Sequence, residues 1–165
     1  MYARLARESD VEGARAAFRL RALAGEQELV LSLWESREDA ERAGQWYELE
    51  SDQPMGDPDA EPGAVGVYHF DGPMSPAHHA AASAANARIQ AGMADHPGGV
   101  RALVLWQPEA RAQVVVVLSA TLESLEDGQR KVMAMDLAPG EDPALLPGPS
   151  RAEVYRVVPE RSVAR

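Results

Sequence analysis

The chain has 165 residues and a formal net charge of −10 at pH 7, from 26 acidic and 16 basic residues. Because an acidic surface repels phosphate groups, we expect no nucleic acid and no anionic membrane as a partner. The absence of cysteine excludes disulfides, thiolate metal sites and thiol nucleophiles. The chain begins without an apolar signal segment, and no apolar run has the length of a membrane span, so we expect a soluble, cytoplasmic protein.

Residues 1–50 predict a first small unit of strands and helices. Strands are expected at residues 2–7, 18–23, 28–34 and 46–50. Between the first two strands, residues 10–16 leave room for only a turn or two of helix. Ser36 is a favourable N-cap for a helix over residues 36–44. The apolar residues of 10–23 also fit the spacing of one helix, so both interpretations of this stretch stay open.

Residues 65–165 predict a second unit, after an acidic linker over 51–64 that is rich in proline and glycine. Helices are expected over residues 75–94 and 121–127, each with a hydroxyl residue as N-cap. Strands are expected at residues 66–70, 100–106, 113–118 and 131–137, with one further strand at 152–158 after a proline-rich loop over 138–150. The order is β-α-β-β-α-β, the ferredoxin-like unit.

The two units repeat one pattern. The stretches 18–45 and 100–129 each contain an apolar strand, a polar turn, a second apolar strand and a charged helix that ends in Gly-Gln. Residues 29–31 and 114–118 are apolar on both faces, as in strands that are buried on both sides. We therefore predict an α+β fold of two ferredoxin-like halves, the first with a shortened first helix, whose antiparallel sheets cover each other.

The run ELVLSLWESREDAERAG at residues 28–44 resembles the second hairpin strand and second helix of the antibiotic biosynthesis monooxygenase family. The opening MYARLARES and the strand GVYHF resemble the family's first strand. The resemblance implies a dimeric α/β-barrel fold, here in a tandem form within one chain. The second half departs from the Trp-Glu-Ser element, with Leu118-Ser119-Ala120-Thr121 in its place, and the first half departs by its short first helix.

The resemblance also implies a function. Such proteins bind small apolar or aromatic molecules, and some are cofactor-independent monooxygenases of polyketide-type substrates, so no cofactor is expected. A homodimer is one expected assembly. The alternative is a non-catalytic protein of the same fold that binds a small molecule or has a structural or regulatory role, since fold does not fix function.

Seven residues are candidates for the site. The catalytic candidates are Trp34, Asn86 and His69, and the ligand-binding candidates are His79, Ser83, Tyr68 and Trp106. Trp34 matches the family's tryptophan by its place in the Trp-Glu-Ser element, and its indole N–H can bind a substrate oxygen. Its other interpretation is a core tryptophan at a junction between strand and helix.

Two further candidates have alternatives of the same kind. Asn86 shares a helix face with His79, Ser83 and Gln90, and this stripe either lines a cavity or faces solvent. His69 alternates onto the strand face opposite Tyr68, where a buried neutral histidine can act as a base or serve only in a structural hydrogen bond.

Metal and haem are not predicted. His78 and His79 are adjacent, so on a helix they diverge by about 100° and cannot chelate one ion together. Haem-degrading relatives carry a histidine on the helix after the Trp-Glu-Ser element, and residues 36–44 contain none. The sequence also lacks the GxGxxG, P-loop, GxSxG and HExxH motifs, so the common dinucleotide, phosphate and hydrolase mechanisms are without their signatures.

Overall fold

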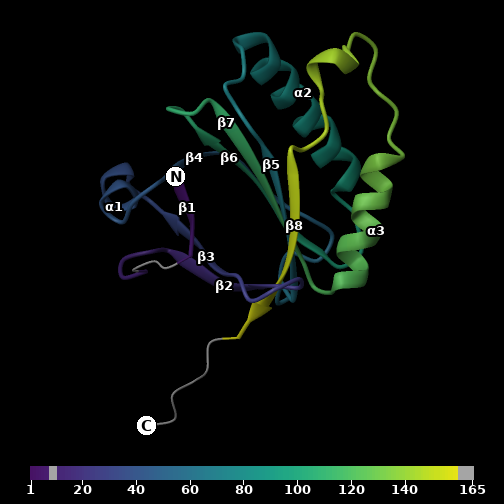
Figure 1. Ribbon diagram of the computed structural model, residues 1–165. Helices are drawn as coiled ribbons and strands as arrows, with labels where there is room; N and C mark the ends of the chain where they lie inside the picture. The colour runs from purple at the N-terminus through teal and green to yellow at the C-terminus, as the bar shows by residue number, and fades with distance from the viewer. Residues whose placement is uncertain (8–10, 160–165) are drawn as a thin grey trace.

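The computed structural model describes residues 1–7 and 11–159. In this part of the chain, eight antiparallel strands form one closed barrel with the helices on its outside (Figure 1). The strands are β1 (Tyr2–Ala6), β2 (Ala16–Ala22), β3 (Glu28–Trp34), β4 (Tyr47–Pro54), β5 (Ala64–Phe70), β6 (Gly99–Gln107), β7 (Ala112–Ser119) and β8 (Arg151–Val158). The helices are α1 (Arg37–Arg42), α2 (Pro76–Met93), α3 (Leu122–Met133) and the short 3-10 helix η1 (Pro143–Leu145).

Each half of the barrel has the same strand order. Around the barrel the strands follow β4-β1-β3-β2 and then β8-β5-β7-β6, so corresponding strands of the two halves occupy corresponding places. Pairing of β2 with β8, and of β4 with β6, joins the halves at both edges. Closure of this kind removes the exposed edges that an open sheet would have. The prediction of two ferredoxin-like halves in one barrel is confirmed.

The barrel interior is a single apolar core. Leu31 of β3, Val116 of β7 and Tyr155 of β8 are each 0% exposed and belong to one cluster that draws on both halves. Side chains alternate along a strand, so their neighbours in sequence point outward, beneath the helices. The shared core that was predicted from the strands apolar on both faces is therefore present.

The predicted short helix near the start of the chain is wrong for the described part of that stretch. Residues 11–15 form a turn, and residues 8–10 lie outside the described residues. Gly13 has a φ of +85°, in the left-handed region that a right-handed helix does not use. The interpretation of 10–23 as one helix is also wrong, because β2 begins at Ala16 and pairs with β3 as a hairpin.

The strand predicted at 131–137 is wrong as well. Helix α3 continues to Met133, and β8 takes the fourth strand position that 131–137 was expected to fill. The helix outlasts the prediction because Leu125, Gly128 and Val132 recur at helical spacing and face the sheet. Arg130 and Lys131 in the last turn suit the negative end of the helix dipole.

Strand β4 extends to Pro54, so the first residues of the predicted linker belong to the sheet, and residues 55–63 connect β4 to β5. None of the helices in the described part of the chain is long and apolar enough to cross a membrane.

Candidate functional site

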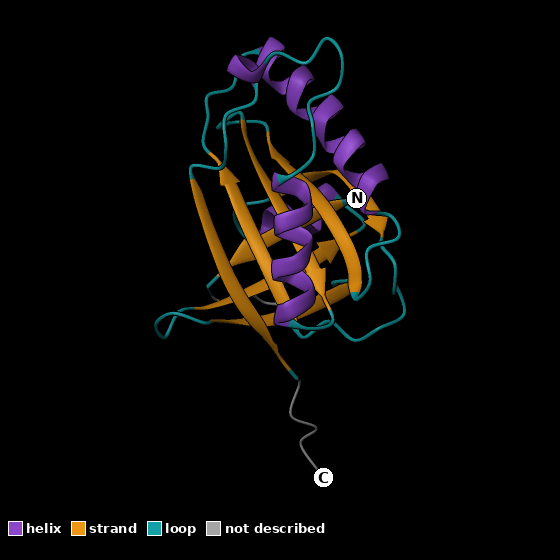
Figure 2. Cartoon of the chain, turned by 90° about the vertical axis from the view of Figure 1, so that its right-hand side faces the viewer, coloured by secondary structure: helices purple, strands orange, loops and turns teal. Residues whose placement is uncertain are grey.

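A cavity of about 200 Å³ lies outside the barrel and beneath α2 and α3 of the second half, with Gln53 and Pro54 of β4 also in its lining. The two helices cover the outer face of the sheet there (Figure 2). Val104 of β6 and Val115 and Val117 of β7 form the floor, because strand alternation turns them away from the barrel core. Ile89 and Met93 of α2 contribute to the wall. The lining is mostly apolar, which suits a small apolar ligand.

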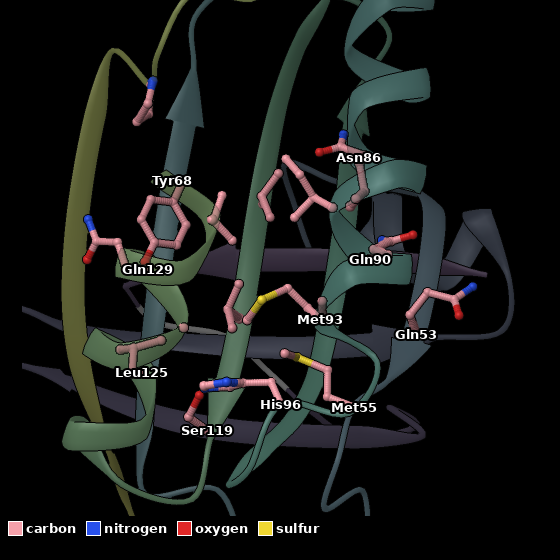
Figure 3. A pocket seen from close by; sticks show the side chains of 18 of the residues that line it. Gln53, Met55, Tyr68, Asn86, Gln90, Met93, His96, Ser119, Leu125 and Gln129 are labelled. Carbon is pink, nitrogen blue, oxygen red and sulfur yellow. The ribbon is translucent and has the colours of Figure 1, made fainter. Parts of the chain in front are cut away.

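Ser119 is a polar exception at one end of the cavity (Figure 3). It is 1% exposed, and its Oγ has no hydrogen-bond partner among the described residues. His96 lines the same end, and its Nε2 lies 2.8 Å from the backbone carbonyl oxygen of Ser124. Because a carbonyl oxygen only accepts, the Nε2 of His96 carries the proton and donates it.

A chain of hydrogen bonds connects the other end of the cavity to the sheet. Asn86 of α2 lines the cavity, and its Nδ2 donates to Oε1 of Gln113 at 3.1 Å. The Nε2 of Gln113 donates in turn to Oε2 of Glu50 at 3.3 Å. The second oxygen of Glu50, Oε1, lies 2.6 Å from Nε2 of His79. Residues from β4, β7 and α2 are thereby linked in one polar network.

Two further contacts hold α2 on the sheet. The ring of His79 stacks on that of Trp106, with centroids 3.8 Å apart and an interplanar angle of 8°. Gln90 exchanges hydrogen bonds with the hydroxyl of Ser51, at 2.9 and 3.1 Å. The predicted stripe on this helix therefore faces the sheet at His79, Asn86 and Gln90, whereas Ser83 is exposed.

Tyr68 of β5 lies on the cavity side, and burial raises the pKa of its hydroxyl above the usual value. His69, the next residue, points to the opposite side, where it lines a hollow of about 490 Å³ at one end of the barrel. Its Nε2 lies 3.0 Å from a carboxylate oxygen of Glu153. Burial lowers the pKa of His69, nearby Arg151 lowers it further, and Glu153 acts in the opposite direction.

Trp34 lies beneath α1 in the first half, where it is 3% exposed and packs with Trp46 and Ala40. Its indole Nε1 donates to Oγ of Ser32 at 3.0 Å. Trp34 does not line the cavity under α2 and α3. Of the seven predicted site residues, the structure brings Asn86 and Tyr68 to that cavity, and it links His79 and Trp106 to Asn86 through Glu50 and Gln113.

The sequence interpretation missed Ser119, His96, Gln113 and Glu50. Gln113 and Ser119 are the two polar ends of an otherwise apolar strand, and a polar residue at an outward strand position is the signal that was available. Among residues 1–7 and 11–159, no group of three or more histidine, aspartate and glutamate side chains is placed to hold a metal ion.

No protein-family model and no curated protein matches the sequence. Solved structures match nearly the whole chain. A ferredoxin-fold protein of Listeria monocytogenes related to antibiotic biosynthesis monooxygenases has a TM-score of 0.64 at 10% identity, over 96% of this chain and 94% of that one. A heme-degrading enzyme of Listeria monocytogenes has a TM-score of 0.62 at 9% identity, over 94% and 99%. An anthrone oxidase-like protein has a TM-score of 0.59 at 16% identity, over 96% and 90%.

The chain has the fold of these monooxygenase-related proteins. The dimeric α/β-barrel fold predicted from residues 28–44 and from the repeated order of elements is thus confirmed, with both halves in one chain. In this fold, the cavity under α2 and α3 is a partly open apolar space with polar groups at its ends, and it is the candidate site.

Proposed function

We propose that the protein binds a small, largely apolar molecule, an aromatic one above all, in the cavity under α2 and α3. The observation that carries this proposal is the buried hydroxyl of Ser119, which faces an apolar cavity and has no partner among the described residues. An unsatisfied buried polar group costs about 1–3 kcal/mol. A ligand that places a polar atom at that end, besides any polar group that it has at the Asn86 end, recovers this cost while its apolar body contacts the valines of the floor.

The size of the cavity suits such a ligand. An engineered apolar cavity of about 150 Å³ in another protein binds benzene. The cavity here measures about 200 Å³ and therefore has room for about one or two fused rings, with larger ligands extending through its open side.

Cofactor-independent oxygenation of a phenol or anthrone of polyketide type is the chemistry we propose for this site. The likeness in fold to an anthrone oxidase-like protein supports it. In such a reaction the substrate supplies the electrons, one atom of dioxygen enters the substrate, and the other leaves as water. The apolar walls exclude water from the substrate, and His96, a lining residue whose Nε2 donates to the carbonyl of Ser124, is the side chain that we propose as the base.

Haem does not fit the residues of this cavity. His96 is its lining histidine, and the Nε2 that a haem iron would need is engaged by the carbonyl of Ser124. His79 lies nearby, but its Nε2 is held by Glu50. The cavity is also small for a macrocycle, because its side chains leave about 200 Å³.

Binding is tested by isothermal titration calorimetry with 2-naphthol. Val115→Phe places a ring in the cavity from its floor and should lower the affinity at least about tenfold, the equivalent of 1.4 kcal/mol. Ala87→Phe is the matched control, because it adds the same ring at an exposed position of α2. Equal affinity in the wild type and in a folded Val115→Phe variant would contradict the proposed site.

The chemistry is tested by oxygen uptake with a hydroxylated anthrone, in metal-free buffer without flavin or nicotinamide. We expect uptake that depends on the protein and is lost in Val115→Phe but retained in Ala87→Phe. If 2-naphthol binds and no anthrone is oxidised, the result favours the non-catalytic alternative.

A further inference from the structure

The hydrogen-bond chain behind Asn86 fixes which kind of polar group the ligand carries. We infer that the ligand presents a hydrogen-bond donor, a hydroxyl or an N–H, to the Oδ1 of Asn86, and that Glu50 enforces this preference from outside the cavity. The inference rests on the proposed function, since it names the class of ligand that the cavity under α2 and α3 takes.

Glu50 determines which group donates and which accepts in each hydrogen bond of this series. A carboxylate has acceptors only, so the group of Gln113 that lies 3.3 Å from Oε2 of Glu50 has to be its NH2. With that end of the amide fixed, the Oε1 of Gln113 points toward Asn86. Gln113 is 2% exposed, so water offers its side chain little alternative.

The same logic continues to the cavity. The Oε1 of Gln113 only accepts, so the group of Asn86 that lies 3.1 Å from it has to be the Nδ2. The remaining atom of the amide, Oδ1, lies on the cavity side of Asn86, with the nitrogen turned away (Figure 3). The cavity is thus offered the acceptor Oδ1 at this place, while an N–H of the same side chain is engaged by Gln113.

Glu50 is itself held in place. Its other oxygen, Oε1, accepts from Nε2 of His79 at 2.6 Å, and the His79 ring stacks on Trp106. The Glu50 side chain is 25% exposed and is not part of the cavity lining, so it acts as a positioning residue. Without its charge, the amides of Gln113 and Asn86 can both turn by half a rotation and present an NH2 group to the ligand.

The neighbouring amide, Gln90, does not have this constraint. Its partner is the hydroxyl of Ser51, which can both donate and accept, so Gln90 can turn to suit either type of ligand group. Asn86 is therefore the residue that discriminates. Phenols, alcohols and aromatic amines are favoured, whereas a ketone or ether at the same place would oppose one acceptor with another.

The test compares two probes of nearly equal shape, 2-naphthol and 2-fluoronaphthalene, by isothermal titration calorimetry. The first has a donor and the second has none. We expect the wild type to bind 2-naphthol about tenfold more tightly, as one satisfied hydrogen bond allows. Asn86→Ala should bring the ratio of the two affinities close to one, and Ser83→Ala, an exposed position one turn earlier on α2, should leave it unchanged.

Glu50→Gln tests the positioning role without a large change of shape. We expect the ratio to fall about threefold or more and 2-acetonaphthone, whose carbonyl is an acceptor, to gain affinity. The inference is overturned if wild type binds both naphthalenes equally, or if the ratio is preserved in Asn86→Ala or in Glu50→Gln. Failure of every naphthalene probe to bind the wild type would instead overturn the proposed function itself.

Discussion

The two halves of the chain build their sheets alike but cover them differently. In each half a helix follows the third strand, and its N-cap, Ser36 or Thr121, accepts a hydrogen bond from the backbone N–H three residues on. Two residues before these caps stand Trp34 in the first half and Ser119 in the second, at the same outward strand position. A large ring occupies that position in one half, and a small hydroxyl leaves it open in the other.

The two halves also differ in what lies between their first two strands, and this difference explains why the cavity lies under the helices of the second half. The second half has the long helix α2 between its first two strands, whereas the corresponding described residues of the first half, 11–15, form a turn. That turn packs close to the ring of Trp34, since a Cβ at Gly13 would lie 3.8 Å from it. In the first half, Trp34 and Trp46 fill the outer face of the sheet under α1. In the second half, α2 crosses the outer face of the sheet and leaves a cavity beneath it. The barrel therefore depends on both halves, and the proposed site lies under the helices of the second half, with Gln53 and Pro54 of β4 also in its lining.

The largest expected effect comes from breaking what the halves share. Val116→Asp places a carboxylate in the barrel core, where Val116 is 0% exposed, and an unpaired buried charge costs several kcal/mol of a stability of about 5–15 kcal/mol. We expect the whole chain to unfold, as followed by circular dichroism and tryptophan fluorescence. Val116→Ala is the control and should remain folded. Survival of either half as a separately folded unit in Val116→Asp would show that the core is not shared.

A second substitution separates stability from binding. Trp34→Ala empties the space under α1 and should cost about 3–5 kcal/mol of unfolding free energy in urea, as for other buried tryptophans. Because Trp34 lies outside the cavity, the affinity of the folded variant for 2-naphthol should not change. If the folded Trp34→Ala variant lost affinity for 2-naphthol, Trp34 would belong to the ligand site after all.

A third substitution makes the second half more like the first. Ser119→Met puts a flexible apolar chain where the cavity is open, and methionine adapts well to irregular space. We expect little change in the thermal midpoint and a fall of about tenfold in affinity for 2-naphthol. Unchanged affinity in this variant would mean that the ligand does not reach the Ser119 end.

The smallest expected effect concerns pH. The folded pKa of His69 is lowered from 6.5, so protonation favours the unfolded chain, and the stability held by the neutral ring is present above pH 6.5 and lost as pH falls through the folded pKa. His69→Gln should reduce the fall in urea midpoint between pH 7.5 and pH 5. His78→Gln serves as the control, since His78 is bonded within its own helix turn. An equal fall in wild type and His69→Gln would contradict this account.

Local patterns predicted the repeated architecture well. Strand β3 and helix α1 follow from alternating leucines and from Ser36 as a cap, and both lie close to their predicted positions. The end of α3 was missed because the apolar residues of 131–137 also suit a strand, and only packing against the sheet decides between the two.

The site was predictable in part. Asn86 and Tyr68, which line the cavity, were candidates from helix and strand periodicity, although the sequence left open whether the Asn86 stripe faces a cavity or solvent. The network behind Asn86 was not, because Glu50 meets Gln113 only through the pairing of β4 with β6 and of β6 with β7. Ser119 was not predicted, because a serine at the end of an apolar strand becomes a candidate for ligand binding only when helices α2 and α3 are known to cover it.

The central claim is that the space under α2 and α3 is the ligand site, and a crystal structure of the protein soaked with 2-naphthol tests it most directly. We predict that the rings lie on Val115 and Val117, with the hydroxyl within hydrogen-bond distance of Oδ1 of Asn86. A probe bound at the barrel end beside His69, or one whose hydroxyl meets the NH2 group of Asn86, would contradict this account.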